Sequence, residues 1–351
     1  MTKPLYLVTG AAGFVGRHLV EHLVARGDRV RAMVRKPEQA GDLKGLAEEV
    51  VIGDLQKPET LASAVEGVAG IYHIAAVFRV GHLPDEVFHE INAEGVRRML
   101  DAAIAAGVPR FVHCSTNGVH SHIEHPPAAE DYPFSPGDVY QESKLAGELI
   151  AMEYFNAGRI CGAILRPAMI YGPGDTRMLK LFKMIAKRRF FYIGRGEALV
   201  HWLDVRDLAE AFRLAMMAEE VNAEAFLIAG REYMTLAESA REIARQLDVP
   251  EPWLRLPVGP MMTLAHATEL VCVPLGIDPP LFRRRVAFFL KNRAFNISKA
   301  ETMLGYAPKQ DLAGEIADTI ADYRARGDLP PVKTEMTTPG AGDLPRQERH
   351  E

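Results

Sequence analysis

Tyr140 and Lys144 are the residues whose types and spacing best suit proton transfer. They lie four positions apart at the start of a helical pattern over residues 140–155, so they share one helix face, one turn apart. A free tyrosine, with a pKa of about 10, is a poor acid or base at neutral pH, but a nearby ammonium group favours the phenolate and lowers that pKa. Tyr-x-x-x-Lys alone is a common coincidence. Together with a glycine-rich turn near the N-terminus, it predicts a proton relay beside a bound dinucleotide.

That turn is Thr-Gly-Ala-Ala-Gly-Phe-Val-Gly over residues 9–16, between a strand pattern and a helical pattern. Glycines permit a tight turn and let the backbone approach a pyrophosphate, while the helix N-terminus supplies unpaired N–H groups and a partial positive charge. The spacing Gly-x-x-Gly-x-x-Gly differs from Gly-x-Gly-x-x-Gly, but its place in the chain is the one a dinucleotide site requires. The predicted contacts are Gly10, Gly13, Phe14, Val15 and Gly16.

The end of the second predicted strand, residues 30–34, indicates which cofactor fits. NAD sites usually place an acidic residue there, which binds the ribose hydroxyls. Here the position, 18 residues after Gly16, holds Val34, and Arg35 and Lys36 follow. A cation at this place suits a 2′-phosphate. We therefore expect Arg35 to favour NADP(H), with NAD(H) as the alternative.

Apolar runs of strand length alternate with longer helical patterns in the first half of the chain. Strands are predicted at residues 5–9, 30–34, 50–52, 70–74, 110–114 and 161–166, and helices at 16–26, 58–66, 87–106 and 140–155. Alternating βα units indicate an α/β fold, a Rossmann doubly wound parallel sheet. We expect a dinucleotide-binding core over residues 1–174 with returning segments near 200–230, a smaller discontinuous substrate-binding and lid region over 175–199 and 231–326, and a disordered tail over 327–351.

Composition and charge argue against several other classes of protein. The chain has 351 residues and a net charge of −5, so a nucleic-acid partner is not expected. Its three cysteines form no Cys-x-x-Cys pair, which favours a reducing compartment over a disulfide framework. No signal peptide precedes the first strand, and the uncharged stretch 256–268 is shorter than the about 20 apolar residues of a membrane span, so we expect a cytoplasmic chain without a transmembrane segment. The histidines crowded into residues 113–125 fit no single helix face, so no metal site is predicted.

Further motifs accompany the turn and the Tyr/Lys pair in a fixed order. They are Gly53-Asp54-Leu55, His73-Ile74-Ala75-Ala76, the strand end Ser115-Thr116, Arg166-Pro167, Tyr171-Gly172-Pro173-Gly174, residues 204–209, residues 298–300 and residues 304–306. Over roughly residues 5–308 the chain thereby resembles an extended short-chain dehydrogenase/reductase of the NAD-dependent epimerase/dehydratase superfamily. The resemblance implies an oxidoreductase on a Rossmann fold.

The resemblance also implies roles for individual residues. Tyr140 would donate or accept the proton, and Lys144 would also hold the nicotinamide ribose. Thr116 or Ser115 would hydrogen-bond the substrate oxygen, and Thr116, 24 residues before Tyr140, is the better match. Asn92 matches a recurring asparagine of the family, with helix packing as an equal alternative. The other implied cofactor contacts are Asp54 and Leu55 at the adenine, Ala75 and Ala76 along the cofactor, and Pro167 and Ile170 near the nicotinamide.

Three observations bear on the substrate. Nucleotide-sugar members place a diphosphate-binding arginine seven residues before the aspartate that matches Asp207, but this chain has Val200 there. Their second diphosphate-binding arginine usually precedes Gly-Asp, and the nearest candidate in this chain is Arg293, which Ala-Phe follows. Sugar 4,6-dehydratases carry Thr-Asp-Glu where this chain has Thr-Asn-Gly at residues 116–118. The second strand, residues 30–35, resembles that of NADP-dependent dihydroflavonol reductases. The lid, with Pro279-Pro280-Leu281 and residues 293–299, resembles that of 3β-hydroxysteroid dehydrogenase-like proteins.

These features predict hydride transfer to or from a ketone or secondary alcohol on a fairly apolar small molecule. Three alternatives remain open. The chain could be a nucleotide-sugar epimerase, a binding protein that senses NADP(H), or a protein that also contacts a membrane surface through residues 260–290. A homodimer through the helices at 87–106 and 140–155 is the expected assembly.

Overall fold

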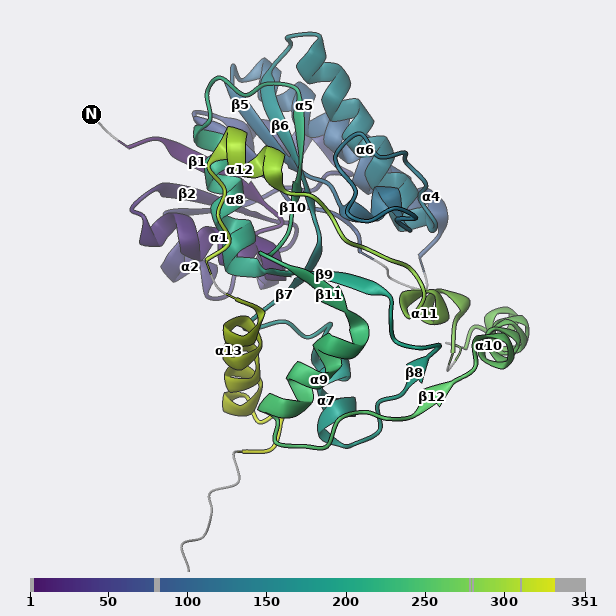
Figure 1. The fold of residues 1–351 in the computed structure, drawn as a ribbon. Helices are drawn as coiled ribbons and strands as arrows, with labels where there is room; N and C mark the ends of the chain where they lie inside the picture. The colour runs from purple at the N-terminus through teal and green to yellow at the C-terminus, as the bar shows by residue number, and fades with distance from the viewer. Residues whose placement is uncertain (1–2, 79–82, 278, 280, 310, 332–351) are drawn as a thin grey trace, which may run out of the picture.

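A seven-stranded parallel sheet forms the centre of the fold (Figure 1). The computed structural model describes residues 3–78, 83–277, 279, 281–309 and 311–331. The strands follow the spatial order β10-β6-β5-β4-β1-β2-β3, and each neighbouring pair is parallel. Their bounds are β1 (Leu5–Thr9), β2 (Arg29–Val34), β3 (Glu49–Ile52), β4 (Gly70–His73), β5 (Arg110–Cys114), β6 (Cys161–Pro167) and β10 (Glu224–Ile228). This is the Rossmann strand order with β10 at its edge, so the predicted fold class is confirmed.

Helices cover both faces of this sheet because its strands bury side chains on both faces. Leu7 and Val8 are neighbours in β1 and both are fully buried, yet they belong to separate hydrophobic clusters. One cluster includes side chains of α1 (Phe14–Ala25), α2 (Leu43–Leu46), α8 (Val205–Met217) and α12 (Ser298–Leu304). The other includes side chains of α3 (Leu61–Val65), α5 (Gly95–Ala105) and α6 (Val139–Asn156). Short helical turns η1 (Pro37–Gln39), η2 (Pro58–Thr60) and η4 (Asn117–His120) join these elements.

The helix predicted over residues 87–106 is divided in the structure. It begins as α4 (Asp85–His89), continues through the π-helical turn η3 (Glu90–Glu94), and becomes α5. Asn92 lies in this turn, where its buried amide bonds the backbone of Val77 and the hydroxyl of Ser143. A π-turn departs from the 3.6-residue period and often occurs at a functional site, so apolar periodicity does not predict it.

A smaller region lies at the carboxyl-terminal edge of the large sheet (Figure 1). It contains a three-stranded sheet of β7 (Met169–Tyr171), β9 (Leu199–Asp204) and β11 (Tyr233–Thr235), and a two-stranded sheet of β8 (Tyr192–Ile193) and β12 (Arg255–Leu256). The strands of this region pack against α7 (Leu179–Ala186), α9 (Leu236–Gln246) and α13 (Leu312–Ala325) in a third hydrophobic cluster. The segment 254–290 forms β12, α10 (Val258–Cys272), η5 (Val273–Leu275) and α11 (Arg283–Phe288). The chain returns from the smaller region to the large sheet through α8 and β10.

The expected tail begins later than residue 327. Leu329 is buried, and its backbone N–H donates to the carbonyl of Tyr323 in α13. Asp328 pairs with Lys183 of α7 at 2.9 Å. The disorder predicted from residue 327 is therefore wrong at its start, because one apolar side chain and one ion pair fasten residues 327–329 to the smaller region. Residues 332–351 lie outside the described residues.

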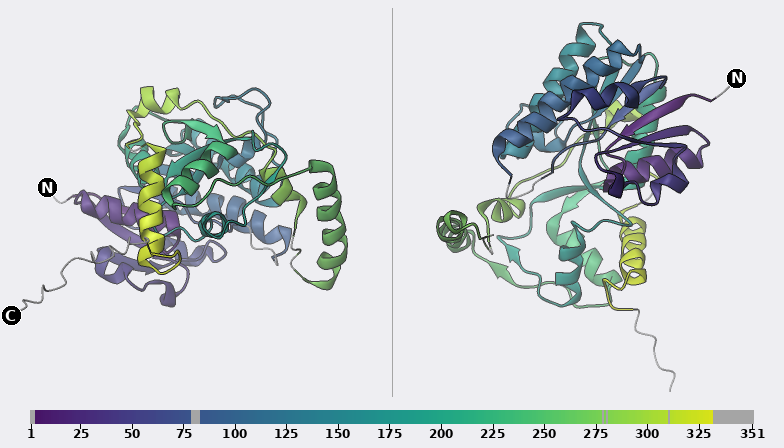
Figure 2. Two further views of the ribbon diagram at one scale, coloured as in Figure 1. Left: turned by 60° about the horizontal axis from the view of Figure 1, so that its bottom comes forward. Right: turned by 180° about the vertical axis from the view of Figure 1, so that it is seen from behind.

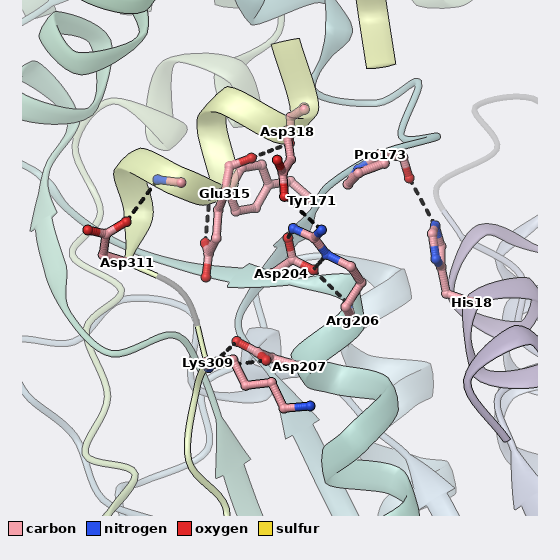
Figure 3. Close-up of polar contacts among 12 residues, drawn as sticks. His18, Tyr171, Pro173, Asp204, Arg206, Asp207, Lys309, Asp311, Glu315 and Asp318 are labelled. Atoms are coloured by element: carbon pink, nitrogen blue, oxygen red, sulfur yellow. Dashed lines mark hydrogen bonds and ion pairs between the residues drawn. The ribbon is translucent and has the colours of Figure 1, made fainter. Parts of the chain in front are cut away.

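A cluster of acidic groups joins α13 to the end of β9 and the start of α8 (Figure 3). Glu315 is 2% exposed and accepts a 2.7 Å hydrogen bond from the Tyr171 hydroxyl. Arg206 binds Asp204 at 2.8 Å and Asp318 of α13 at 2.8 Å. Burial, reinforced by the neighbouring Asp204 and Asp207 carboxylates, raises the pKa of Glu315 to about 8. Burial also raises the pKa of Asp207 to about 6.

The Glu315→Gln variant should lose a pH dependence of stability that the wild type shows between about pH 6 and pH 8. Glu315 keeps its proton in the folded chain up to about pH 8, whereas a glutamate in the unfolded chain loses its proton near about pH 4.3. The unfolded state thus binds fewer protons in this range, and stability falls as pH rises, by up to about 1.4 kcal/mol per pH unit. Glutamine cannot ionise but can still accept from Tyr171.

Urea midpoints at about pH 6.5 and about pH 8 test this expectation, because Asp207 has largely ionised before that range. The exposed Glu301→Gln variant is the matched control and should keep the wild-type dependence. An unchanged pH dependence in Glu315→Gln would contradict the burial argument.

Candidate active site

A cavity of about 870 Å³ opens at the carboxyl ends of the strands of the large sheet. Its size is that of a cofactor and substrate site, and in open α/β sheets such sites lie at this edge. One wall comes from the glycine-rich turn and the ends of β2 and β4, another from the end of β5 and the start of α6, and a third from β7 and the segment around α11. The predicted site residues that line it are Gly10, Gly13, Phe14, Val15, Gly16, Arg35, Asp54, Leu55, Ala75, Ala76, Ser115, Thr116, Tyr140, Lys144, Pro167 and Ile170.

The glycine-rich turn packs backbone against backbone too closely for side chains at Gly10 and Gly16. Gly10 has φ +68°, and a Cβ there would lie 2.9 Å from the backbone of Ala75. A Cβ at Gly16 would lie 2.2 Å from the Gly10 carbonyl oxygen. Gly13 precedes α1 without a side-chain capping bond, so the first-turn N–H groups of a 12-residue helix face the cavity wall. The turn therefore fits a dinucleotide pyrophosphate.

Thr9 fastens this turn to the neighbouring strand, a role that sequence reasoning missed. Its hydroxyl accepts from the backbone N–H groups of Ile74 and Ala75 at 3.0 and 3.1 Å. The same hydroxyl lies 3.1 Å from Nδ1 of His73. Burial, together with the nearby Lys144 ammonium, lowers the pKa of His73 to about 3, so the ring is neutral and can accept the Thr9 proton. The sequence feature that could have indicated this role is the threonine at the end of the first predicted strand.

Tyr140 and Lys144 are positioned by the first turns of α6. The Asp138 side chain caps this helix by accepting from the Gln141 N–H at 2.9 Å. Tyr140 packs edge-on against the ring of Phe78, with centroids 4.9 Å apart. Lys144 is 2% exposed, and its Nζ donates to the Cys114 carbonyl at 2.6 Å.

Burial lowers the pKa of Lys144, while the nearby Cys114 and Glu148 oppose this shift. The carbonyl contact fixes the ammonium at the end of β5, on the same cavity wall as Tyr140. A cation in such a position favours the phenolate form of a neighbouring tyrosine.

Thr116 and Ser115 differ in how their hydroxyls are used. The Thr116 hydroxyl accepts a 3.1 Å bond from the Gly118 N–H at the start of η4, so this bond leaves its proton for donation. The Ser115 hydroxyl instead bonds the buried carboxylate of Glu148. Both residues line the cavity, but the geometry favours Thr116 as the donor to a substrate oxygen.

A buried ion pair lies behind Ser115. Glu148 and Arg166 are 1% and 4% exposed, and the carboxylate accepts from Nε and Nη2 of the guanidinium at 2.9 and 2.6 Å. Nη1 of Arg166 donates to the Glu130 carbonyl at 2.7 Å. Sequence reasoning placed Arg166 in a motif but missed this pair. Its signal was Glu148, a carboxylate one helical turn beyond Lys144 on a buried face.

Several lining residues were not predicted as site residues. Gln39 accepts through its side-chain oxygen from the backbone N–H groups of Arg35 and Lys36 at 3.1 and 3.0 Å, which orders the end of β2. Val200 is buried in β9, but Arg293, its neighbour in an isolated bridge, lines the cavity. The other newly found lining residues include Met33, Phe78, Met169, Arg177, Met178, Phe282, Arg285, Phe288 and Lys291. In the described part of the chain, no group of three His, Cys, Asp or Glu side chains could hold a metal ion.

Several known proteins are similar to this chain. The model of the NAD dependent epimerase/dehydratase family matches residues 6–229. Sterol demethylase protein B of Methylococcus capsulatus is 31% identical, over 92% of this chain and 98% of that protein. The 3beta-hydroxysteroid-dehydrogenase/decarboxylase isoform 1 of Arabidopsis thaliana is 27% identical, over 96% of this chain and 83% of that protein. The dTDP-glucose 4,6-dehydratase DesIV of Streptomyces venezuelae, solved with NAD bound, shares the fold with a TM-score of 0.73 at 24% identity, over 94% of this chain and 100% of that chain.

Proposed function

Because the chain belongs to the NAD-dependent epimerase/dehydratase family and is an oxidoreductase of the extended short-chain type, we propose that it transfers hydride between a nicotinamide cofactor and a ketone or secondary alcohol on a fairly apolar small molecule. The proposed substrate class rests on the apolar side chains of the cavity lining, of which Phe78 packs against Tyr140. These side chains are Phe78, Met169, Met178, Phe282 and Phe288. Aromatic and methionine side chains adapt to bulky apolar shapes. The names of the two relatives make a 3-hydroxysterol or 3-ketosteroid the first substrate to test.

In the proposed reaction, the bound nicotinamide would supply or accept the hydride. Tyr140 moves the proton to or from the substrate oxygen, and Thr116 donates a second hydrogen bond to that oxygen. Lys144, fixed by the Cys114 carbonyl, favours the tyrosinate and holds the nicotinamide ribose. The α1 N-terminus and Gly10 hold the pyrophosphate.

We expect NADP⁺ to bind more tightly than NAD⁺, by about tenfold or more, because Arg35 lines the cavity at the end of β2, where no acidic side chain stands. The Arg35→Ala variant should lose this preference while its NAD⁺ affinity stays unchanged. Calorimetry with both cofactors measures the effect. Arg195→Ala, whose side chain is exposed and outside the cavity lining, is the matched control. Tighter binding of NAD⁺ by the wild type would contradict the proposal.

A second candidate, the nucleotide-sugar epimerase, is favoured by the cations that line the cavity. Arg177, Lys291 and Arg293 could bind a diphosphate, even though Val200 replaces the expected arginine. Turnover over a panel of steroid ketones, flavonoid-like ketones and UDP- or dTDP-sugars separates the two activities. Turnover of sugar nucleotides alone would favour the epimerase, and cofactor binding without turnover of any member would favour the NADP(H)-sensing protein.

The proposed assembly and location of the protein do not rest on the geometry of the cavity. A homodimer through α5 and α6 rests on the family resemblance, and a cytoplasmic location rests on composition. Sedimentation velocity would test the dimer. Among the described residues, no helix is long and apolar enough to cross a membrane.

A further inference from the structure

Apolar side chains gather on the outer surface of one segment of the smaller region. We name this set the lid surface. Its members are Trp253, Leu254, Leu264, Leu270, Val271, Leu275 and Ile277, all exposed. Seven of the 15 large hydrophobic side chains exposed in the described residues thus fall within 25 consecutive positions. Scattered exposed hydrophobics are ordinary, whereas their concentration in one segment marks that segment as a candidate interaction site.

Helix α10 exposes apolar side chains in addition to those that it packs inward. Of its described side chains, Ala265 is buried, and it packs with Val286 of α11. Leu264 and Val271 are exposed, at positions seven apart and therefore on one outward face. A helix on a protein surface normally presents polar residues there. Glu269 is the acidic residue of α10, and its carboxylate accepts a 2.8 Å hydrogen bond from the backbone N–H of Arg283.

The segment that carries this apolar face is basic in sequence. By sequence, residues 253–293 contain six Lys or Arg (255, 283, 284, 285, 291 and 293) and two acids (269 and 278), a net charge of +4 within a chain of −5. Arg255, Arg283 and Arg285 are exposed. Trp253 is 78% exposed, and tryptophan favours the polar–apolar boundary of a bilayer. Apolar side chains beside clustered arginines complement the acyl chains and anionic headgroups of a phospholipid surface.

The helix that carries much of the lid surface packs against a helix that lines the cavity. Helix α11 packs against α10, and Phe282, Arg285 and Phe288 at α11 form part of the cavity wall. In Figures 1 and 2, α10 lies at the outer edge of the molecule, with α11 between it and the large sheet. A membrane that binds α10 would therefore lie beside the substrate side of the cavity.

We propose that the lid surface docks reversibly on an anionic phospholipid membrane and turns the substrate side of the cavity toward the lipid. Docking itself is independent of the reaction; its use for taking apolar substrate from lipid rests on the proposed function. The sequence left open a membrane contact through residues 260–290; the proposed docking surface includes most of α10 from that range and adds Trp253, which lies before it.

Fluorescence with vesicles tests the proposal directly on the full chain. The chain has two tryptophans. Trp202 is buried and Trp253 is exposed, so a spectral change on docking reports Trp253. Vesicles of phosphatidylcholine with phosphatidylserine should shift the emission to shorter wavelength, and brominated lipid should quench it. The Trp253→Phe variant should lose both signals. An unchanged spectrum together with no co-sedimentation would overturn the proposal.

A matched pair of double variants tests the location. Leu264→Glu/Val271→Glu should lower the vesicle partition coefficient at least tenfold, since it places charge on the docking face. Met217→Glu/Met303→Glu replaces exposed apolar residues outside the lid surface and should leave the partition unchanged. High salt or neutral phosphatidylcholine should weaken docking of the wild type.

Equal partition of both double variants would overturn the proposal. So would a concentration-dependent dimer that Leu264→Glu/Val271→Glu abolishes without any vesicle binding by the wild type, because the surface would then bind a second copy. Cofactor affinity measured in parallel shows that each variant is folded. Vesicle binding by a protein that turns over no ketone would leave docking in place and reject the proposed function instead.

Discussion

Replacing Tyr140 with phenylalanine is expected to lower kcat by about 10²- to 10⁴-fold, the usual range for loss of a positioned acid–base group. Cofactor affinity should change little, because the turn around Gly10 and the α1 N-terminus are untouched. The phenylalanine ring keeps the edge-on contact with Phe78, so the first turn of α6 retains its packing. Steady-state turnover with calorimetric cofactor binding separates the two effects.

Tyr233→Phe is the matched control, since Tyr233 is exposed on β11 and outside the cavity lining. It should retain wild-type turnover. If Tyr140→Phe keeps kcat within threefold of the wild type, the proton relay is wrong. A Lys144→Met variant adds a pH test: without the buried ammonium, the rise of alcohol oxidation with pH should move to higher pH, because the Tyr140 phenolate is less favoured.

Local sequence patterns were sufficient for the large sheet and for the cavity wall nearest the cofactor. The predicted strands at residues 5–9 and 110–114 coincide with β1 and β5, because apolar runs buried on both faces require no distant partner to be recognised. The glycine-rich turn was likewise readable, since its spacing and its place after the first strand are local features.

The substrate side of the cavity depends on contacts that no local pattern encodes. The bridge between Val200 and Arg293 joins residues far apart in sequence, and it brings the segment after α11 to the cavity. Sequence reasoning predicted a lid there but not that Phe282 and Phe288 would form the wall. The prediction of disorder from residue 327 was wrong for the same reason, because Leu329 is buried against a core formed by residues distant in sequence.

The ion pair behind Ser115 shows the same limit and has the largest consequence for stability. Glu148 follows from helix periodicity and Arg166 from a strand motif, but their pairing depends on α6 lying across β6. Two charges so completely buried lose most of their hydration, and each depends on the other to offset that loss.

The Arg166→Met variant should therefore lose about 3–5 kcal/mol of unfolding free energy, the usual cost of leaving one buried charge unpaired. It also removes the donor to the Glu130 carbonyl. Urea unfolding measures the loss. The exposed pair of Arg17 and Glu21 supplies the control, and Arg17→Met should cost less than about 1 kcal/mol.

The double variant Glu148→Gln/Arg166→Met distinguishes the unpaired charge from the lost packing. It removes both charges and leaves an amide to accept from the Ser115 hydroxyl, so it should regain a large part of the stability lost in Arg166→Met. If the double variant is no more stable than Arg166→Met, the cost lies in packing and in the Glu130 contact. If it regains stability but turnover stays low, the intact ion pair also positions the β5 end that carries Ser115 and Thr116.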